Sequence, residues 1–270
     1  LFDYISGSHN KKLKKYVIDE SKRKQEPLPN ENPTPWILKI QFLFTQLVLG
    51  VNDLHANNIC HLDLSLENSM IQMYTIKAKH DFNVKDEYNI SKIIDFGLAV
   101  EFKDLNKIKS NTKRVGKVGY MAPEVFAKEN YDARSADIYC LGVMLFMMLC
   151  GAPPYTKPTL KDPAFKYIIK GRLKDVLSHW KRLRLVTQDA LDCLSAIFRQ
   201  QNKRITMDKL LKLPFIIQDI IDDNEILSVK ANMNNNNGNI PNDDVKIADA
   251  NVSRSMDIER KSSEQMSVDS

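Results

Sequence analysis

The sequence has few cysteines, glycines and tryptophans, and it lacks a long hydrophobic run. Its 270 residues include four cysteines, nine glycines and two tryptophans. The cysteines stand far apart, at positions 60, 140, 150 and 193. This spacing argues against a secreted disulfide framework and against a paired zinc motif. We therefore expect a reducing, cytoplasmic compartment.

The longest apolar run and the charge pattern exclude two further classes of protein. The run, residues 141–154, ends in a Pro-Pro pair and is shorter than the roughly 20 apolar residues that cross a bilayer. It indicates a buried helix. The formal net charge of +5 at pH 7 is modest, and the basic clusters other than residues 113–117 are interpreted as solvated surface. We expect neither a membrane span nor a nucleic-acid partner.

What is present indicates a mainly helical core. With 43% hydrophobic residues, the chain has enough apolar side chains to form a buried core. Apolar residues recur at helical spacing over residues 36–57. Two β-rich pieces follow, 70–76 and 90–94, and the polar segment between them, 77–89, is expected to be an inserted hairpin loop at the surface. The remaining helices are predicted at 136–149, 165–180, 187–198 and 206–213, and a polar, disordered tail from about residue 222.

Three short motifs stand in a fixed order along the chain. They are HLDLSLEN at residues 61–68, DFG at 95–97 and APE at 122–124. Each is weak by itself, but their order and spacing together match the signature of protein kinases. The chain resembles the eukaryotic protein kinase superfamily over roughly residues 1–220.

The resemblance implies a fold and two segments. Residues 1–220 are expected to form a mainly α C-terminal lobe of a protein kinase with a small β-hairpin region, and residues 221–270 a disordered low-complexity tail. Some features look like divergent FIKK kinases and others like calcium/calmodulin-dependent kinases, so the subfamily stays open. Glu124 is the expected buried partner of Arg204, and His61 and Phe96 resemble the apolar stack that aligns the two lobes.

The resemblance also implies a chemistry: ATP-dependent phosphorylation of serine or threonine in a protein substrate. Asp63 would orient the attacking hydroxyl, while Mg²⁺ ions bridge the phosphates of ATP. Asn68 and Asp95 carry the oxygen ligands that Mg²⁺ prefers. Glu67 and Met70 are the other positions expected to contact the nucleotide, Met70 as part of the floor beneath adenine or else as plain core.

The sequence departs from the family pattern at three positions of the expected site. Leu62 replaces the arginine that precedes the catalytic aspartate, which makes switching by loop phosphorylation less favoured. Ser65 stands where serine/threonine kinases carry a lysine, and Lys117 stands where they carry a threonine. The two residue types have exchanged places, so Lys117 could deliver the same charge with Ser65 as its hydrogen-bond partner. Alternatively, Lys117 points to solvent and the enzyme is weakened.

Parts of a complete kinase are not found in this sequence. It contains no Gly-rich loop, strand lysine or helix glutamate upstream of the three motifs, and it begins with Leu1. We expect a fragment of a longer parent protein, inactive by itself, whose partner is the N-terminal lobe of the same polypeptide. The rival interpretation is a pseudokinase or binding scaffold that performs no phosphotransfer.

Overall fold

The structure, a computed structural model, describes residues 1–3, 5, 33–77, 85–101 and 114–216. The predicted tail, residues 221–270, lies outside the described residues. The described chain is mainly helical, with two sheets of two strands each. Its elements are α2 (Pro35–Ala56), β1 (Ile59–Cys60), β2 (Ser69–Lys77), β3 (Lys85–Ile93), β4 (Val100–Glu101), α3 (Pro123–Phe126), α4 (Ala133–Cys150), α5 (Pro163–Ile168), α6 (Leu173–His179), α7 (Gln188–Ile197), α8 (Met207–Leu210) and short 3₁₀ turns at Leu183–Leu185 and Gln201–Lys203.

Helix α2 begins and ends where its sequence provides caps. The Thr34 hydroxyl accepts a hydrogen bond from the Ile37 amide at 3.3 Å, and Pro35 occupies the first turn, where its missing N–H costs nothing. The helix ends before Asn57, and Asn58 follows with φ of 59°. The apolar face predicted from the periodicity is buried at Ile40, Leu43, Phe44, Leu47 and Val51.

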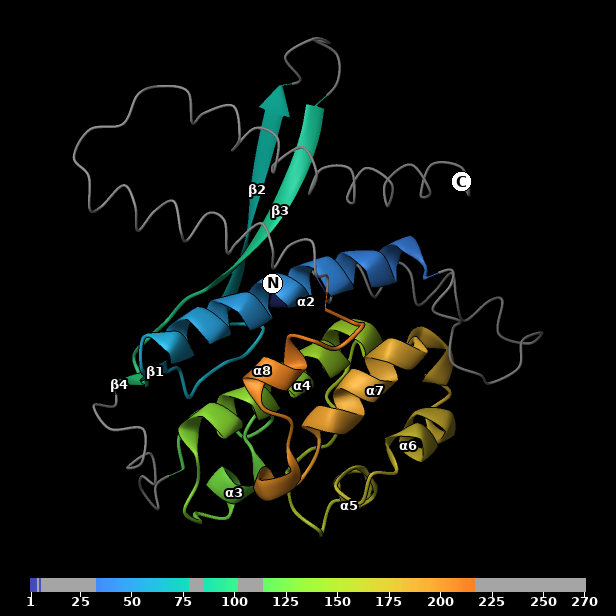
Figure 1. The fold of residues 1–270 in the computed structure, drawn as a ribbon. Helices are drawn as coiled ribbons and strands as arrows, with labels where there is room; N and C mark the ends of the chain where they lie inside the picture. Colours follow the sequence, from blue (N-terminus) through green and yellow to red (C-terminus); the bar gives the residue numbers. More distant parts are fainter. Residues whose placement is uncertain (4, 6–32, 78–84, 102–113, 217–270) are drawn as a thin grey trace.

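Helix α4 is the central core helix. Figure 1 shows it in the middle of the helical body, with α2, α7 and α8 around it. It begins after the Asp132 N-cap, ends at Gly151 in a left-handed conformation, and is buried along most of its length. It starts three residues before the helix predicted at 136–149, because the Asp132 side chain caps it by accepting a hydrogen bond from the Arg134 amide at 2.9 Å.

Two of the described helices, α2 and α4, are long and apolar enough to cross a membrane by length and composition. The protein interior buries 56% of the most apolar window of α2 and 83% of that of α4. Core helices of globular domains pass the same test, so this is weak evidence for a span. The absence of a membrane span stays a prediction.

Gly142 of α4 lies close against the C-terminal end of α7. A β-carbon at this position would lie 2.4 Å from Ile197 Cγ2 and 3.3 Å from Phe198 Cε1. We expect Gly142→Ala to lower the free energy of unfolding, because overpacking costs about 1–3 kcal/mol and better helix propensity returns at most about 1 kcal/mol. Denaturant titration measures the change. Gly119→Ala is the control, since a β-carbon there meets nothing within 4 Å; equal stability of the two variants would contradict the expectation.

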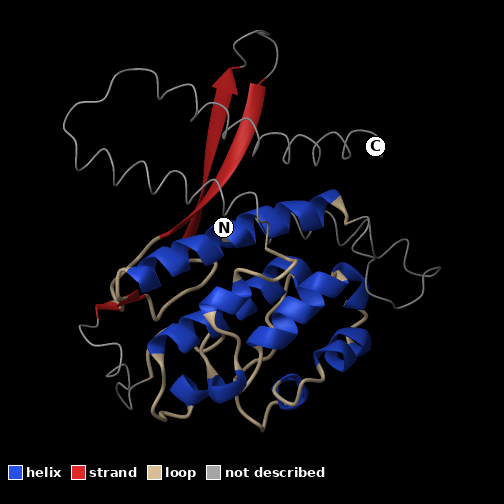
Figure 2. Ribbon diagram, viewed as in Figure 1, coloured by secondary structure: helices blue, strands red, loops and turns tan. Residues whose placement is uncertain are grey.

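Three expected elements differ from the structure. The helix predicted over 206–213 is confined to α8, which ends at Leu210. The single helix predicted over 165–180 is two helices, α5 and α6, because Gly171 between them has φ of 79° and turns the chain. The predicted hairpin is present, but its loop is shorter than the predicted 77–89, because β3 begins at Lys85 and pairs in antiparallel register with β2, Lys77 opposite Lys85. Hydrogen bonds between backbone groups pair the two strands, so the strands can extend through a segment that has no alternating apolar residues. The hairpin projects from the helical body beside α2 (Figure 2).

Candidate active site

The loop of residues 61–68, which we call the Asp63 loop, connects β1 to β2 and is anchored from below by α4. The buried Asp137 carboxylate accepts hydrogen bonds from the His61 amide at 2.9 Å and from the Leu62 amide at 2.8 Å. Leu62 is buried and has φ of 61°, a conformation that costs energy in a residue other than glycine. The two hydrogen bonds to Asp137 therefore hold a strained turn directly before Asp63.

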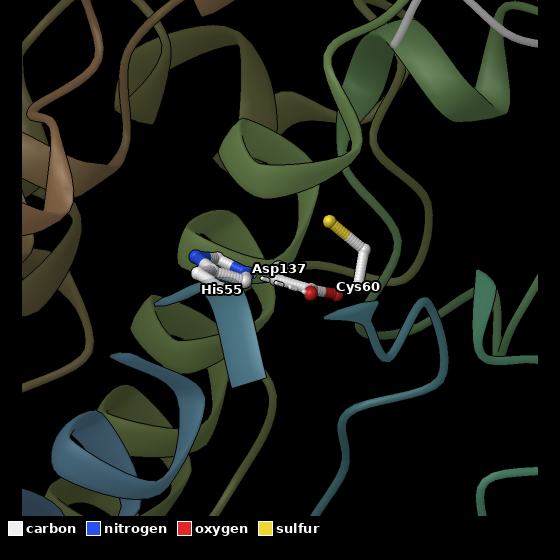
Figure 3. A group of neighbouring side chains, drawn as sticks. All are labelled: His55, Cys60 and Asp137. Carbon is white, nitrogen blue, oxygen red and sulfur yellow. Dashed lines mark hydrogen bonds and ion pairs between the residues drawn. The ribbon is translucent and has the colours of Figure 1, made fainter. Parts of the chain in front are cut away.

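His55, Cys60 and Asp137 form a compact buried group beneath this loop (Figure 3). Their nitrogen, sulfur and oxygen atoms lie within 4.8 Å of one another, a spacing that a metal ion could bridge. However, His55 Nε2 lies 3.0 Å from Asp137 Oδ2, and the Asp137 oxygens already accept the two loop amides. Burial also raises the pKa of the Cys60 thiol far above its usual range, so this thiol stays protonated beside Asp137. The group serves as an anchor for the loop.

Asp63 and Asn68 are joined across the Asp63 loop. Asn68 Nδ2 donates to the Asp63 backbone oxygen and to Asp63 Oδ2, both at 2.8 Å. The backbone N–H of Asn68 donates a hydrogen bond to Ser65 Oγ at 3.2 Å. The other Asp63 carboxylate oxygen, Oδ1, accepts the Lys117 backbone amide at 3.1 Å. Both oxygens of the candidate base are thus oriented by N–H donors.

Lys117 lies against the Asp63 loop with its ammonium group inside the site. Its Nζ donates to Ser65 Oγ at 2.8 Å and to Asn68 Oδ1 at 3.0 Å, and lies 3.9 Å from Glu67 Oε2. The hydrogen bond that the sequence predicted between Lys117 and Ser65 is present, although 40% of the Lys117 side-chain surface remains accessible. Its contribution to catalysis stays a prediction.

Gly116 allows the segment that carries Lys117 to approach this closely. Its φ of 84° is in the left-handed region, and a β-carbon there would lie 2.6 Å from the Leu62 backbone oxygen. A side chain at this position would push the two segments apart and take Lys117 away from Asp63.

The 95–97 motif follows β3. Asp95 is exposed with φ of 65°, and its Oδ1 accepts the Gly97 amide at 3.2 Å. The Phe96 ring packs on His61, with 5.1 Å between ring centroids, and His61 Nε2 lies 3.1 Å from the Ile94 oxygen. This stack, expected from the sequence, connects the Asp95 segment to the Asp63 loop.

Met70 and Glu67, the remaining predicted nucleotide contacts, are both exposed. Met70 lies at the start of β2 with 53% of its surface accessible, so it is not core. An exposed methionine fits a position that would meet an aromatic base, but no ligand contact tests it. The roles of Glu67, Asn68, Met70 and Asp95 toward ATP stay predictions.

The pair expected between Glu124 and Arg204 is present and bidentate. Arg204 Nη1 donates to Glu124 Oε1 at 2.6 Å, and Nη2 to Oε2 at 3.0 Å. The Arg204 side chain is fully buried and also stacks over the Tyr139 ring at 4.7 Å. The pair connects α3, which follows the segment of Lys117, to the segment before α8 that carries Arg204.

Sequence reasoning missed Tyr120 and the anchoring role of Asp137. The Tyr120 hydroxyl accepts the Leu66 amide at 3.4 Å, and burial, with Glu67 nearby, raises the pKa of this hydroxyl above its usual range. Tyr120 therefore remains a neutral donor and acceptor under the Asp63 loop. Its place three residues after Lys117 was visible in the sequence, but the contact is with a residue 54 positions away.

Comparison with known proteins shows which family this sequence resembles. Residues 2–216 match the family model of the protein kinase domain. Over 237 residues the chain is 30% identical to serine/threonine-protein kinase 33 of Bos taurus, covering 86% of this chain and 44% of that protein. It is 33% identical over 182 residues to serine/threonine-protein kinase SAPK7 of Oryza sativa, and 34% to SRK2B of Arabidopsis thaliana, covering 67% of this chain and 46% and 45% of those proteins. The chain thus spans a little under half the length of these relatives.

Proposed function

Because the chain belongs to the protein kinase superfamily, we propose that its parent protein transfers the terminal phosphate of ATP to serine or threonine hydroxyls of proteins. The observation that carries the proposal is the cluster of Asp63, Asn68 and Lys117, in which both carboxylate oxygens of Asp63 are oriented by N–H donors. The names of the similar kinases support the Ser/Thr class of acceptor.

In this proposal the residues divide the work of positioning and charge neutralisation. Asp63 accepts a hydrogen bond from the acceptor hydroxyl and takes up its proton as the hydroxyl oxygen bonds to the terminal phosphorus. At the same time the bond from that phosphorus to the bridging oxygen breaks, and ADP leaves with this oxygen. Lys117 supplies a positive charge beside Asp63, held by Ser65 and Asn68. Mg²⁺ bound with ATP neutralises the phosphates. Asp95 fits as its ligand, because its exposed carboxylate is oriented by the Gly97 amide.

The test is phosphate incorporation by the purified parent protein from ATP and Mg²⁺ into peptides with serine, threonine or tyrosine acceptors. We expect transfer to serine or threonine, and a loss of about a hundredfold or more in Asp63→Asn, the range of effects found for a positioned general base. Asp208→Asn, an exposed aspartate in α8, is the matched control and should retain activity. Residues 1–270 by themselves should transfer no phosphate, since these residues include no Gly-rich loop or strand lysine to hold ATP.

Two outcomes would contradict the proposal. Full activity of Asp63→Asn would show that Asp63 does not act as the general base. Nucleotide binding without transfer to any acceptor would favour the pseudokinase or scaffold interpretation.

A further inference from the structure

The amide of Asn68 has only one orientation that satisfies its neighbours. Its Nδ2 donates to two oxygens of Asp63, and its Oδ1 faces the ammonium of Lys117 at 3.0 Å. An ammonium group can only donate, and the Asp63 oxygens here can only accept, so an exchange of the amide oxygen and nitrogen would break all three hydrogen bonds. Asn68 is buried, with 7% of its surface accessible, so water offers few replacements.

This orientation conflicts with the role that the sequence predicted for Asn68. The family arrangement offers the asparagine oxygen to one of two Mg²⁺ ions. Here that oxygen is engaged by a cation that belongs to the chain itself. Ser65 Oγ is the second oxygen in hydrogen-bond contact with the Lys117 ammonium, and Glu67 Oε2 lies 3.9 Å away. The ammonium thus sits among oxygen atoms from three side chains, the kind of surroundings that a bound cation has.

A divalent ion on Asn68 Oδ1 would lie next to this ammonium. Two like charges a few ångströms apart in a partly buried site repel each other strongly, because protein atoms screen the charges less than water does. The ion could bind only if Lys117 moved away, which would break its hydrogen bonds to Ser65 and Asn68. Asp95, by contrast, is exposed and has no such cation among its described contacts.

We propose that the Lys117 ammonium takes the place of one of the two divalent cations, so that this site binds ATP together with a single Mg²⁺, held through Asp95. The inference rests on the proposed function, since it concerns the nucleotide complex of the same site. It changes the role of Asn68 from metal ligand to acceptor for Lys117.

The test counts metal ions and needs no catalysis. The parent protein is saturated with a non-hydrolysable ATP analogue and titrated with Mn²⁺, whose free concentration is read by electron paramagnetic resonance. Wild-type protein is expected to bind one Mn²⁺ per bound nucleotide. Lys117→Met, which keeps side-chain length and removes the charge, is expected to bind two. Lys166→Met, an exposed lysine on α5, is the matched control and should bind one.

The double variant Ser65→Lys with Lys117→Thr restores the usual family arrangement and should also bind two Mn²⁺. It tests the inference independently if Lys117→Met folds poorly. Two ions in the wild-type complex would overturn the inference and leave the proposed function standing. One ion in the wild-type protein and in both site variants would overturn it as well, because the second ion would then be excluded by something other than Lys117. Failure of every variant to bind nucleotide would overturn the proposed function, and this inference with it.

Discussion

Replacing Lys117 by alanine in the parent protein is expected to lower kcat about a hundredfold, the effect typical of removing one preorganised charge or donor from the transition state. The KM for ATP should change far less, because the charge that Lys117 offsets develops during transfer and is not yet present when ATP binds. Steady-state kinetics at low free Mg²⁺ measure both constants. Low Mg²⁺ matters because a second ion could otherwise enter the place that the ammonium leaves.

Two controls test whether the loss of kcat depends on a positive charge at this particular site. Lys166→Ala, on the exposed face of α5, should leave kcat unchanged. The double variant Ser65→Lys with Lys117→Thr should recover much of the lost kcat, so the two substitutions should be strongly non-additive. A kcat for Lys117→Ala within about threefold of wild type would be far short of a transition-state contact and would identify Lys117 as a surface charge held by hydrogen bonds alone.

Replacing Arg204 by methionine is expected to lower the free energy of unfolding by about 3–5 kcal/mol, because it leaves the Glu124 carboxylate buried without its partner. Both side chains are nearly inaccessible, at 0% for Arg204 and 7% for Glu124. The same substitution also removes hydrogen bonds from Arg204 to the Ser135 and Arg199 backbone oxygens. Urea or guanidinium titration of residues 1–270 or of the parent protein measures the change.

An exposed ion pair of the same chain provides the comparison for Arg204→Met. Arg172 pairs with Asp175, and their side chains are 57% and 49% accessible. Arg172→Met should cost at most about 1 kcal/mol, because water screens the pair and solvates whichever charge remains. Similar losses for the two variants would mean that burial does not set the strength of the Glu124–Arg204 pair.

Several elements followed from local sequence alone. The apolar spacing and the caps at Thr34 and Asp132 are local signals, so α2 and α4 could be predicted, although the start of α4 was placed too late. The break at Gly171 was missed, since apolar residues on both sides of it continue the helical spacing, while the left-handed φ of Gly171 turns the chain between α5 and α6. The strand part of the hairpin was missed because its backbone pairing is independent of the side-chain pattern.

For the candidate site, the sequence determined which residue types are present and in which order, and this was enough to identify the family and to pair Ser65 with Lys117. The tertiary structure decided which atom each group contacts. Lys117 meets Asn68 Oδ1 across 49 positions of sequence, and Asp137 holds the Leu62 amide across 75. Such contacts depend on how α4, the Asp63 loop and the segment of Gly116 pack together. Motif spacing encodes local geometry and carries no information on which of the two Asn68 amide atoms will face a lysine from another part of the chain.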